Sequence, residues 1–80
     1  ITRSKAIYVC DNNNITCLQK NFTFDEIQNC DEAFVTGTFA GIIPVSRIEN
    51  NKLSSTNSNS LTNHIRMLYN NHIKESINQL

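Results

Sequence analysis

The chain has 80 residues, of which 39% are hydrophobic, and its seven basic and seven acidic side chains give a formal net charge of zero. The sequence therefore lacks the basic character that nucleic-acid-binding domains and membrane-surface proteins use, and no apolar run approaches the ~20 residues of a membrane span. A chain of this length forms at most one domain. Because it begins with Ile1 rather than methionine, we expect residues 1–80 to be a partial domain of a longer protein.

The first part of the chain predicts a helix, a strand and a second helix. Residues 1–10 (ITRSKAIYVC) carry apolar side chains suited to a short helix that ends at the DNNN turn. Residues 15–22 (ITCLQKNF) alternate loosely and begin with β-branched residues, which predicts a short strand. In residues 23–30 (TFDEIQNC), Thr23 is followed three positions later by Glu26, a capping-box pattern that predicts a short helix.

The middle of the chain predicts two strands and a small hairpin. Residues 32–39 (EAFVTGTF) are rich in strand formers and reach a turn at Gly37. Residues 41–49 (GIIPVSRIE) predict a second strand, which Pro44 confines to an edge or a bulge. The two asparagines that follow form a tight turn, after which KLSS returns as a hairpin partner.

The last segment, residues 61–80, predicts an amphipathic helix of about five turns. Its apolar stripe runs along one face and consists of Leu61, Ile65, Leu68, His72, Ile73 and Ile77. A chain this short can hardly cover that stripe from within, so we expect self-association into a homo-oligomer. The predicted order is α-β-α-β-β-α, a mixed α/β fold.

Cysteine and histidine usage predicts no metal site. Cys10, Cys17 and Cys30 form an odd set without a CxxC pair, which favours reduced thiols in a cytoplasmic protein over a disulfide framework or a zinc site. His64 and His72 are eight residues apart in the last helix, too far around its axis for a simple pair of ligands.

The stretch DEAFVTGTFAGIIPV, residues 31–45, holds both glycines and the only proline of the chain. A strand that ends in TGT presents consecutive backbone N–H groups and two hydroxyls, a nest suited to an anion. A helix that begins near Thr2 offers free N–H groups and the positive end of its dipole, which also favour phosphate. The sequence therefore contains two candidate anion-binding segments.

ITRSKAIYVC, DEAFVTGTFAGIIPVSRIENNKL and LTNHIRMLY, in this order, resemble the C-terminal part of the fold-type IV pyridoxal-phosphate enzymes. That family includes branched-chain and D-amino-acid aminotransferases and aminodeoxychorismate lyase. The resemblance covers nearly all of the chain, and TGTFAGIIPV is its most specific element. It implies a branched-chain-aminotransferase-like fragment that takes part in moving an amino group from an amino acid to a 2-oxo acid.

The resemblance also implies roles for individual residues. Ile1 and Thr2 match the helix start whose backbone amides hold the cofactor phosphate, and Thr38 matches the threonine that binds the same phosphate beside Gly37. Phe39 and Ala40 match positions whose backbone N–H groups lie near the substrate carboxylate. The family's cofactor-binding lysine lies upstream of this segment, and four lysines here match no catalytic position: Lys5, Lys20, Lys52 and Lys74.

These absences lead us to expect no catalysis from the chain alone, and a missing N-terminal half or second subunit as its partner. Residues 54–62 (SSTNSNSLT) also replace a glycine-rich stretch of the family. The alternative interpretations are a non-catalytic α/β interaction module and a decayed gene fragment. Within the family, the sequence leaves transaminase and lyase open, and also L- and D-amino-acid substrates.

Overall fold

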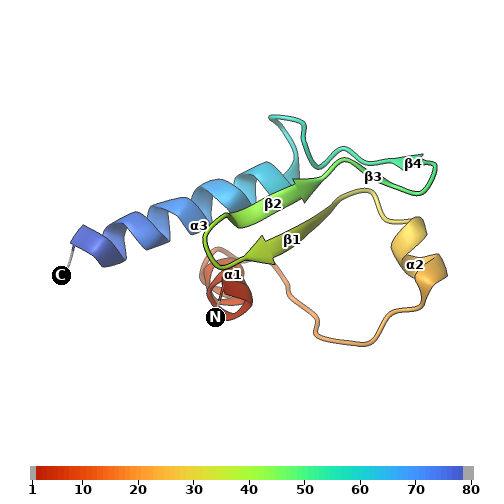
Figure 1. Ribbon diagram of the computed structural model, residues 1–80. Coiled ribbons are helices and arrows are strands. Elements are labelled where there is room, and N and C mark those ends of the chain that lie inside the picture. Colours follow the sequence, from red (N-terminus) through yellow and green to blue (C-terminus); the bar gives the residue numbers. More distant parts are fainter. Residues whose placement is uncertain (1, 79–80) are drawn as a thin grey trace.

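The computed structural model describes the backbone of residues 2–78 and the side chains of residues 2–75. The elements in chain order are α1 (Thr2–Asn12), α2 (Phe24–Gln28), β1 (Ala33–Gly37), β2 (Gly41–Val45), β3 (Arg47–Ile48), β4 (Asn51–Lys52) and α3 (Leu61–Asn78). Helices α1 and α3 pack against the hairpin β1–β2, whereas α2 lies apart from them (Figure 1). The mixed α/β class is confirmed. Within residues 2–78, no helix is both long and apolar enough to cross a membrane.

Strands β1 and β2 form an antiparallel hairpin whose register runs from Ala33 opposite Val45 to Gly37 opposite Gly41. Both strands were expected from the sequence, but the second ends at Val45, four residues earlier than predicted. A two-stranded sheet leaves each strand with a free edge, and such an edge tolerates Pro44. The hairpin therefore projects the three residues 38–40 as its turn.

The centre of the core is a small cluster that joins α1, β2 and α3. Ala6 of α1, Ile42 of β2 and Tyr69 of α3 are buried together, and Phe34 and Ile73 pack against them. Burial of these side chains is the main force that holds α1 and α3 against the hairpin. It therefore sets where the start of α1 lies relative to the turn 38–40.

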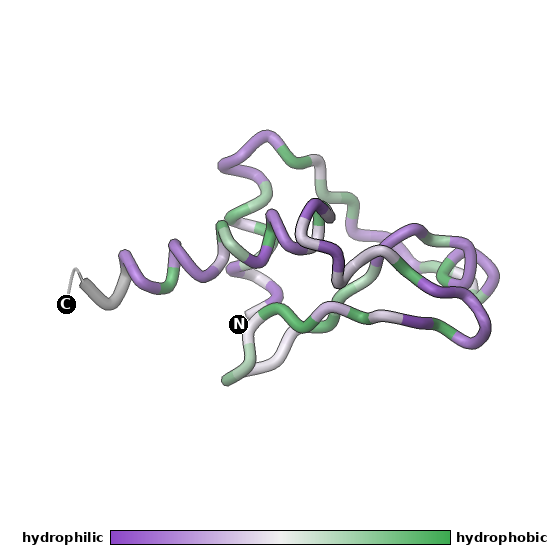
Figure 2. Tube along the Cα trace, turned by 90° about the horizontal axis from the view of Figure 1, so that it is seen from above, coloured by the Kyte–Doolittle hydropathy of each residue, from purple (hydrophilic) through white to green (hydrophobic). Residues whose placement is uncertain are grey.

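Helix α3 has the predicted amphipathic character, since hydrophobic positions recur between hydrophilic ones along its length (Figure 2). Ile65 and Tyr69 are its buried hydrophobic residues within the described side chains, whereas Leu61 at the helix start is half exposed. The expected stripe thus wrongly included Leu61 and omitted Tyr69. The side chain of Ile77 lies outside the described residues.

The strand expected over residues 15–22 is not formed, and this segment is irregular. Cys17, Leu18 and Gln19 line a cavity with residues of α1 and β1, and Arg3 Nη2 donates to Gln19 Oε1 at 3.0 Å. A strand satisfies its N–H and C=O groups by pairing with a neighbouring backbone. Among the described residues β1 pairs with β2 alone, so the β propensity of residues 15–22 is not realised in a ladder.

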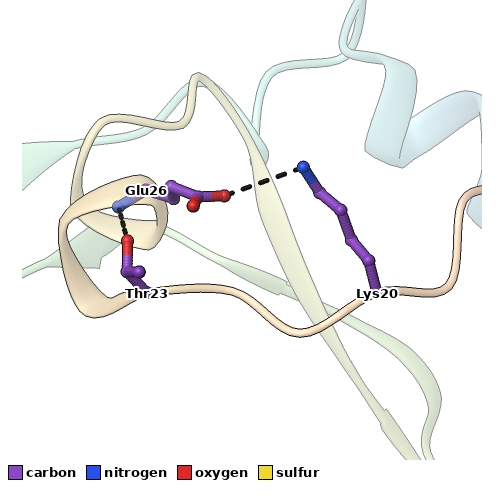
Figure 3. Close-up of polar contacts among 3 residues, drawn as sticks. All are labelled: Lys20, Thr23 and Glu26. Carbon is purple, nitrogen blue, oxygen red and sulfur yellow. Dashed lines mark hydrogen bonds and ion pairs between the residues drawn. The ribbon is translucent and has the colours of Figure 1, made fainter.

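Helix α2 begins with half of the predicted capping box (Figure 3). Glu26 N donates to Thr23 Oγ1 at 3.2 Å, as the sequence pattern predicts. The Glu26 carboxylate lies 3.8 Å from Lys20 Nζ instead. Both side chains of this ion pair are more than half exposed, so it contributes little stability.

The serine-rich segment before α3 is ordered by hydrogen bonds. Ser55 and Ser60 are buried, Ala33 N donates to Ser55 Oγ at 2.8 Å, and Ser60 Oγ donates to Ser55 O at 2.9 Å. Asn63 N donates to Ser60 Oγ at 3.0 Å, which makes Ser60 the N-cap of α3. Residues 54–60 therefore tie β1 to the start of α3.

Candidate anion-binding site

The two segments that the sequence singled out separately lie side by side. Thr2 is the first residue of α1, and its Oγ1 donates to Gly37 O at 3.2 Å across 35 positions of sequence. Gly37 ends β1, and its carbonyl belongs to the same peptide plane as the N–H of Thr38. The Thr2 hydroxyl thus fixes the orientation of the peptide that leads into the turn.

A cavity of about 460 Å³ opens beside this hydrogen bond. Its wall combines the start of α1, the hairpin turn and one face of α3, and its lining residues are Thr2, Lys5, Thr38, Phe39, Gly41, Tyr69 and Ile73. Three residues of the predicted site, Thr2, Thr38 and Phe39, therefore share one cavity. Gly37 and Ala40 are not among its lining residues, and Ile1 lies outside the described residues.

Lys5 is the charged lining residue that sequence reasoning missed. It lies three positions after Thr2 in α1, so both side chains are on the same face of the helix. That spacing was readable from the sequence, but Lys5 had been considered only as a catalytic lysine, a role that it does not match. Lys5 therefore adds a positively charged side chain to the lining of this cavity.

The glycine that needs a left-handed backbone is Gly41, not Gly37. The sequence predicted a sharp turn at Gly37, but that residue is the last of β1 and its φ is not positive. A Cβ at Gly37 would make ordinary contacts, 3.6 Å from Ile43 Cδ1 and 3.7 Å from Ala40 Cβ. Gly41 has φ +72°, and a Cβ there would lie 3.0 Å from Tyr69 Cε1. The position that requires glycine is therefore Gly41, the first residue of β2 after the turn.

The start of α3 is already occupied by a carboxylate. Glu32 Oε1 accepts from Thr62 N at 2.7 Å, and Glu32 Oε2 accepts from Leu61 N at 3.1 Å. The hydrogen bond from the Thr62 backbone lowers the pKa of Glu32 most strongly, and partial burial opposes it more weakly. Glu32 is thus a cap of α3 rather than half of a carboxylate pair with Asp31.

We predict that acid weakens the fold through Glu32. A carboxyl group whose pKa is lower in the folded chain stabilises it above the unfolded pKa, which is ordinarily 4.5, and this contribution is lost as the pH falls below that value. Glu32→Gln should flatten this part of the pH profile and lower stability at neutral pH by about 1 kcal/mol. Urea unfolding at several pH values measures both effects. Asp31→Asn is the control, and an equal effect there would contradict the assignment.

Comparison with known proteins assigns the sequence to a family. The sequence model of the family Amino-transferase class IV matches residues 1–48, from the start of the chain through β3. The chain therefore belongs to the class IV aminotransferases.

Two curated relatives match most of the chain. It is 36% identical over 73 residues to the D-alanine aminotransferase of Bacillus licheniformis, and the matched stretch covers 91% of this chain and 26% of that protein. It is 28% identical over 69 residues to the branched-chain-amino-acid aminotransferase of Pseudomonas aeruginosa, and the matched stretch covers 86% of this chain and 22% of that protein. The chain thus spans about a quarter of the length of the relatives that it matches.

Proposed function

We propose that this chain supplies part of the cofactor-phosphate site of a pyridoxal-phosphate-dependent class IV aminotransferase. The observation that carries the proposal is the shared cavity of Thr2 and Thr38, next to the hydrogen bond that joins Thr2 to Gly37. In the proposed site, the N–H groups at Ile1 and Thr2 and the hydroxyl of Thr38 hold the phosphate. When bound, pyridoxal phosphate supplies an electron sink for reactions at the carbon that bears the amino group.

The residues around the cavity fit a dianion. The first turn of α1 contains no acidic side chain and contributes Lys5. A helix of this length directs its free N–H groups and the positive end of its dipole toward a ligand at its start. The start of α3, by contrast, binds Glu32 and is closed to a second anion. The positive end available on this side of the hairpin is therefore that of α1.

The remaining roles of the whole protein are also proposals. Phe39 and Ala40, in the turn of the hairpin, would present backbone N–H groups to the carboxylate of an amino acid substrate. No lysine of this chain is assigned to the cofactor, so a missing N-terminal half or second subunit would supply it. The chain alone would then be inactive, and the complete enzyme would transfer an amino group to a 2-oxo acid.

The substrate class is proposed more broadly than the sequence alone predicted. The resemblance indicated a branched-chain aminotransferase, whereas the identity is 36% to a D-alanine aminotransferase and 28% to a branched-chain aminotransferase. We therefore propose an aliphatic amino acid as substrate, with the branched-chain L-amino acids and D-alanine as the pair to compare. Assay of the complete protein with both donors and a common 2-oxo acid distinguishes them, and a lyase would convert neither.

Thr38→Val should weaken binding of pyridoxal phosphate by the complete protein about tenfold or more. The change keeps the shape of the side chain and removes one hydrogen bond to a charged acceptor, a loss of about 1.5–3 kcal/mol. Equilibrium titration with the cofactor measures it. Thr36→Val is the matched control because Thr36 lines a different cavity, on the side of Cys10 and Cys17. Equal affinities in wild type and Thr38→Val would contradict the proposal and would mean that the TGT turn has only a structural role.

A non-catalytic interaction module remains the second candidate, and one observation favours it. The Phe39 side chain at the tip of the hairpin is fully exposed, with 102% relative accessibility. An aromatic side chain in that position suits a protein partner as well as it suits a substrate pocket. Titration with inorganic phosphate, followed by NMR, distinguishes the two candidate functions. The proposed enzyme fragment should show amide shifts at Thr2, Lys5 and Thr38, and an interaction module should not.

A further inference from the structure

Cys10 and Cys17 are brought together by the way α1 ends. Cys10 lies in the last turns of α1, and its carbonyl oxygen accepts from Asn13 N at 3.1 Å and from Ile15 N at 2.9 Å. Asn14 adopts a left-handed backbone with φ 61°, the conformation with which helices commonly terminate. The chain therefore reverses direction at Asn14 and returns along the helix, which places Cys17 beside Cys10.

The returning segment is held at a second point. Arg3 Nη2 donates to Gln19 Oε1 at 3.0 Å, close to the start of α1, so residues 15–19 follow the helix for most of its length. Both cysteines line one cavity of about 230 Å³ between this segment, α1 and β1, and Arg3 also lines it. Cys17 is close enough to the Cys10 thiol to contribute to the rise of its pKa. Sequence spacing gave no indication of this pair, because the turn at Asn14 creates it.

We propose that Cys10 and Cys17 form a redox-active dithiol that a low-molecular-weight disulfide, such as oxidised glutathione, converts into an intramolecular disulfide. Both sulfurs are reduced in this structure. The proposal is independent of the cofactor site, since these residues line a separate cavity. The positive charge of Arg3 at the same cavity would attract an anionic oxidant.

The exposure of the two thiols sets the order of the reaction. Cys10 is 4% exposed, and burial together with the neighbouring Cys17 raises its pKa from the ordinary 9.0 to about 11, whereas Cys17 is partly exposed. The Cys17 thiolate attacks one sulfur of the oxidant, breaks its S–S bond and releases one thiol. Cys10 then attacks the Cys17 sulfur, forms the Cys10–Cys17 bond and releases the second thiol. The two protons and two electrons that the cysteines lose are gained by the oxidant.

The test uses the reduced chain in buffers of oxidised and reduced glutathione, followed by alkylation and peptide mass spectrometry. We expect a Cys10–Cys17 disulfide while Cys30 remains a thiol that is alkylated. The equilibrium ratio of disulfide to dithiol should fall about tenfold or more in concentrated urea, because unfolding removes the turn that holds the sulfurs together. Cys30→Ser is the matched control and should leave the ratio unchanged.

Three results would overturn the proposal. They are glutathione attached to Cys17 with Cys10 still a free thiol, a Cys17–Cys30 bridge of equal abundance, and a ratio that does not change in urea. Two variants at the turn add a test that does not alter either sulfur. Asn14→Gly keeps access to the left-handed backbone and should retain disulfide formation, whereas Asn14→Val disfavours that backbone and should reduce it. Equal ratios in these two variants would also contradict the proposal.

Discussion

Ile42→Ala should lower the free energy of unfolding by about 2–5 kcal/mol, the usual cost of replacing a buried isoleucine by alanine. Ile42 is 1% exposed, and it belongs to the same buried cluster as Ala6 of α1 and Tyr69 of α3. An 80-residue chain has a marginal stability of this same order, so we expect a largely unfolded population. Urea unfolding followed by circular dichroism measures the loss.

Ile43→Ala is the matched control for this prediction. It removes the same atoms from the next residue of β2, whose side chain is 39% exposed on the opposite face of the hairpin. Its cost should stay below about 1.5 kcal/mol because much less apolar surface is removed from contact. Equal losses for the two variants would mean that α1 and α3 do not pack on the face of the hairpin that carries Ile42.

Local sequence patterns predicted the elements that depend on local interactions. The helix start at Thr23, the hairpin around TGT and the amphipathic α3 each follow from capping, turn or periodicity signals within a few residues. The strand expected over residues 15–22 failed because a strand requires a partner that lies elsewhere in the sequence. The returning segment instead satisfies part of its polar groups against α1, as the Arg3–Gln19 hydrogen bond illustrates.

Two residues of the candidate site were indicated by the resemblance and not by local patterns. The resemblance to class IV aminotransferases indicated Thr2 and Thr38, and the structure places both on one cavity. Lys5 and Tyr69 were missed because their contribution depends on how α1 and α3 pack against the hairpin. The role of Glu32, which accepts hydrogen bonds at the start of α3 in addition to the N-cap Ser60, was also missed, since 30 positions separate it from Thr62. Contacts across such distances leave no periodic signal in a single sequence.

The second large loss of stability is expected at Gly41, the first residue of β2 after the hairpin turn. Gly41→Ala should lower the free energy of unfolding by about 1–3 kcal/mol from backbone strain alone, because its φ of +72° is costly for a residue with a Cβ. The added methyl group would also lie 3.0 Å from Tyr69 Cε1, so the ring or the strand must shift. Tyr69 and Gly41 both line the candidate site, so that shift changes the cavity as well as the core.

Gly37→Ala separates this explanation from a general intolerance of the hairpin to alanine. A Cβ at Gly37 meets Ile43 Cδ1 at 3.6 Å and requires no left-handed backbone, so the variant should cost less than about 1 kcal/mol. Urea unfolding of both variants gives the comparison, and phosphate titration shows whether the cavity has changed with the fold. If Gly37→Ala proved the more damaging change, the turn would have to close at Gly37 as the sequence first indicated. The proposed position of Thr38 beside α1 would then lose its structural basis.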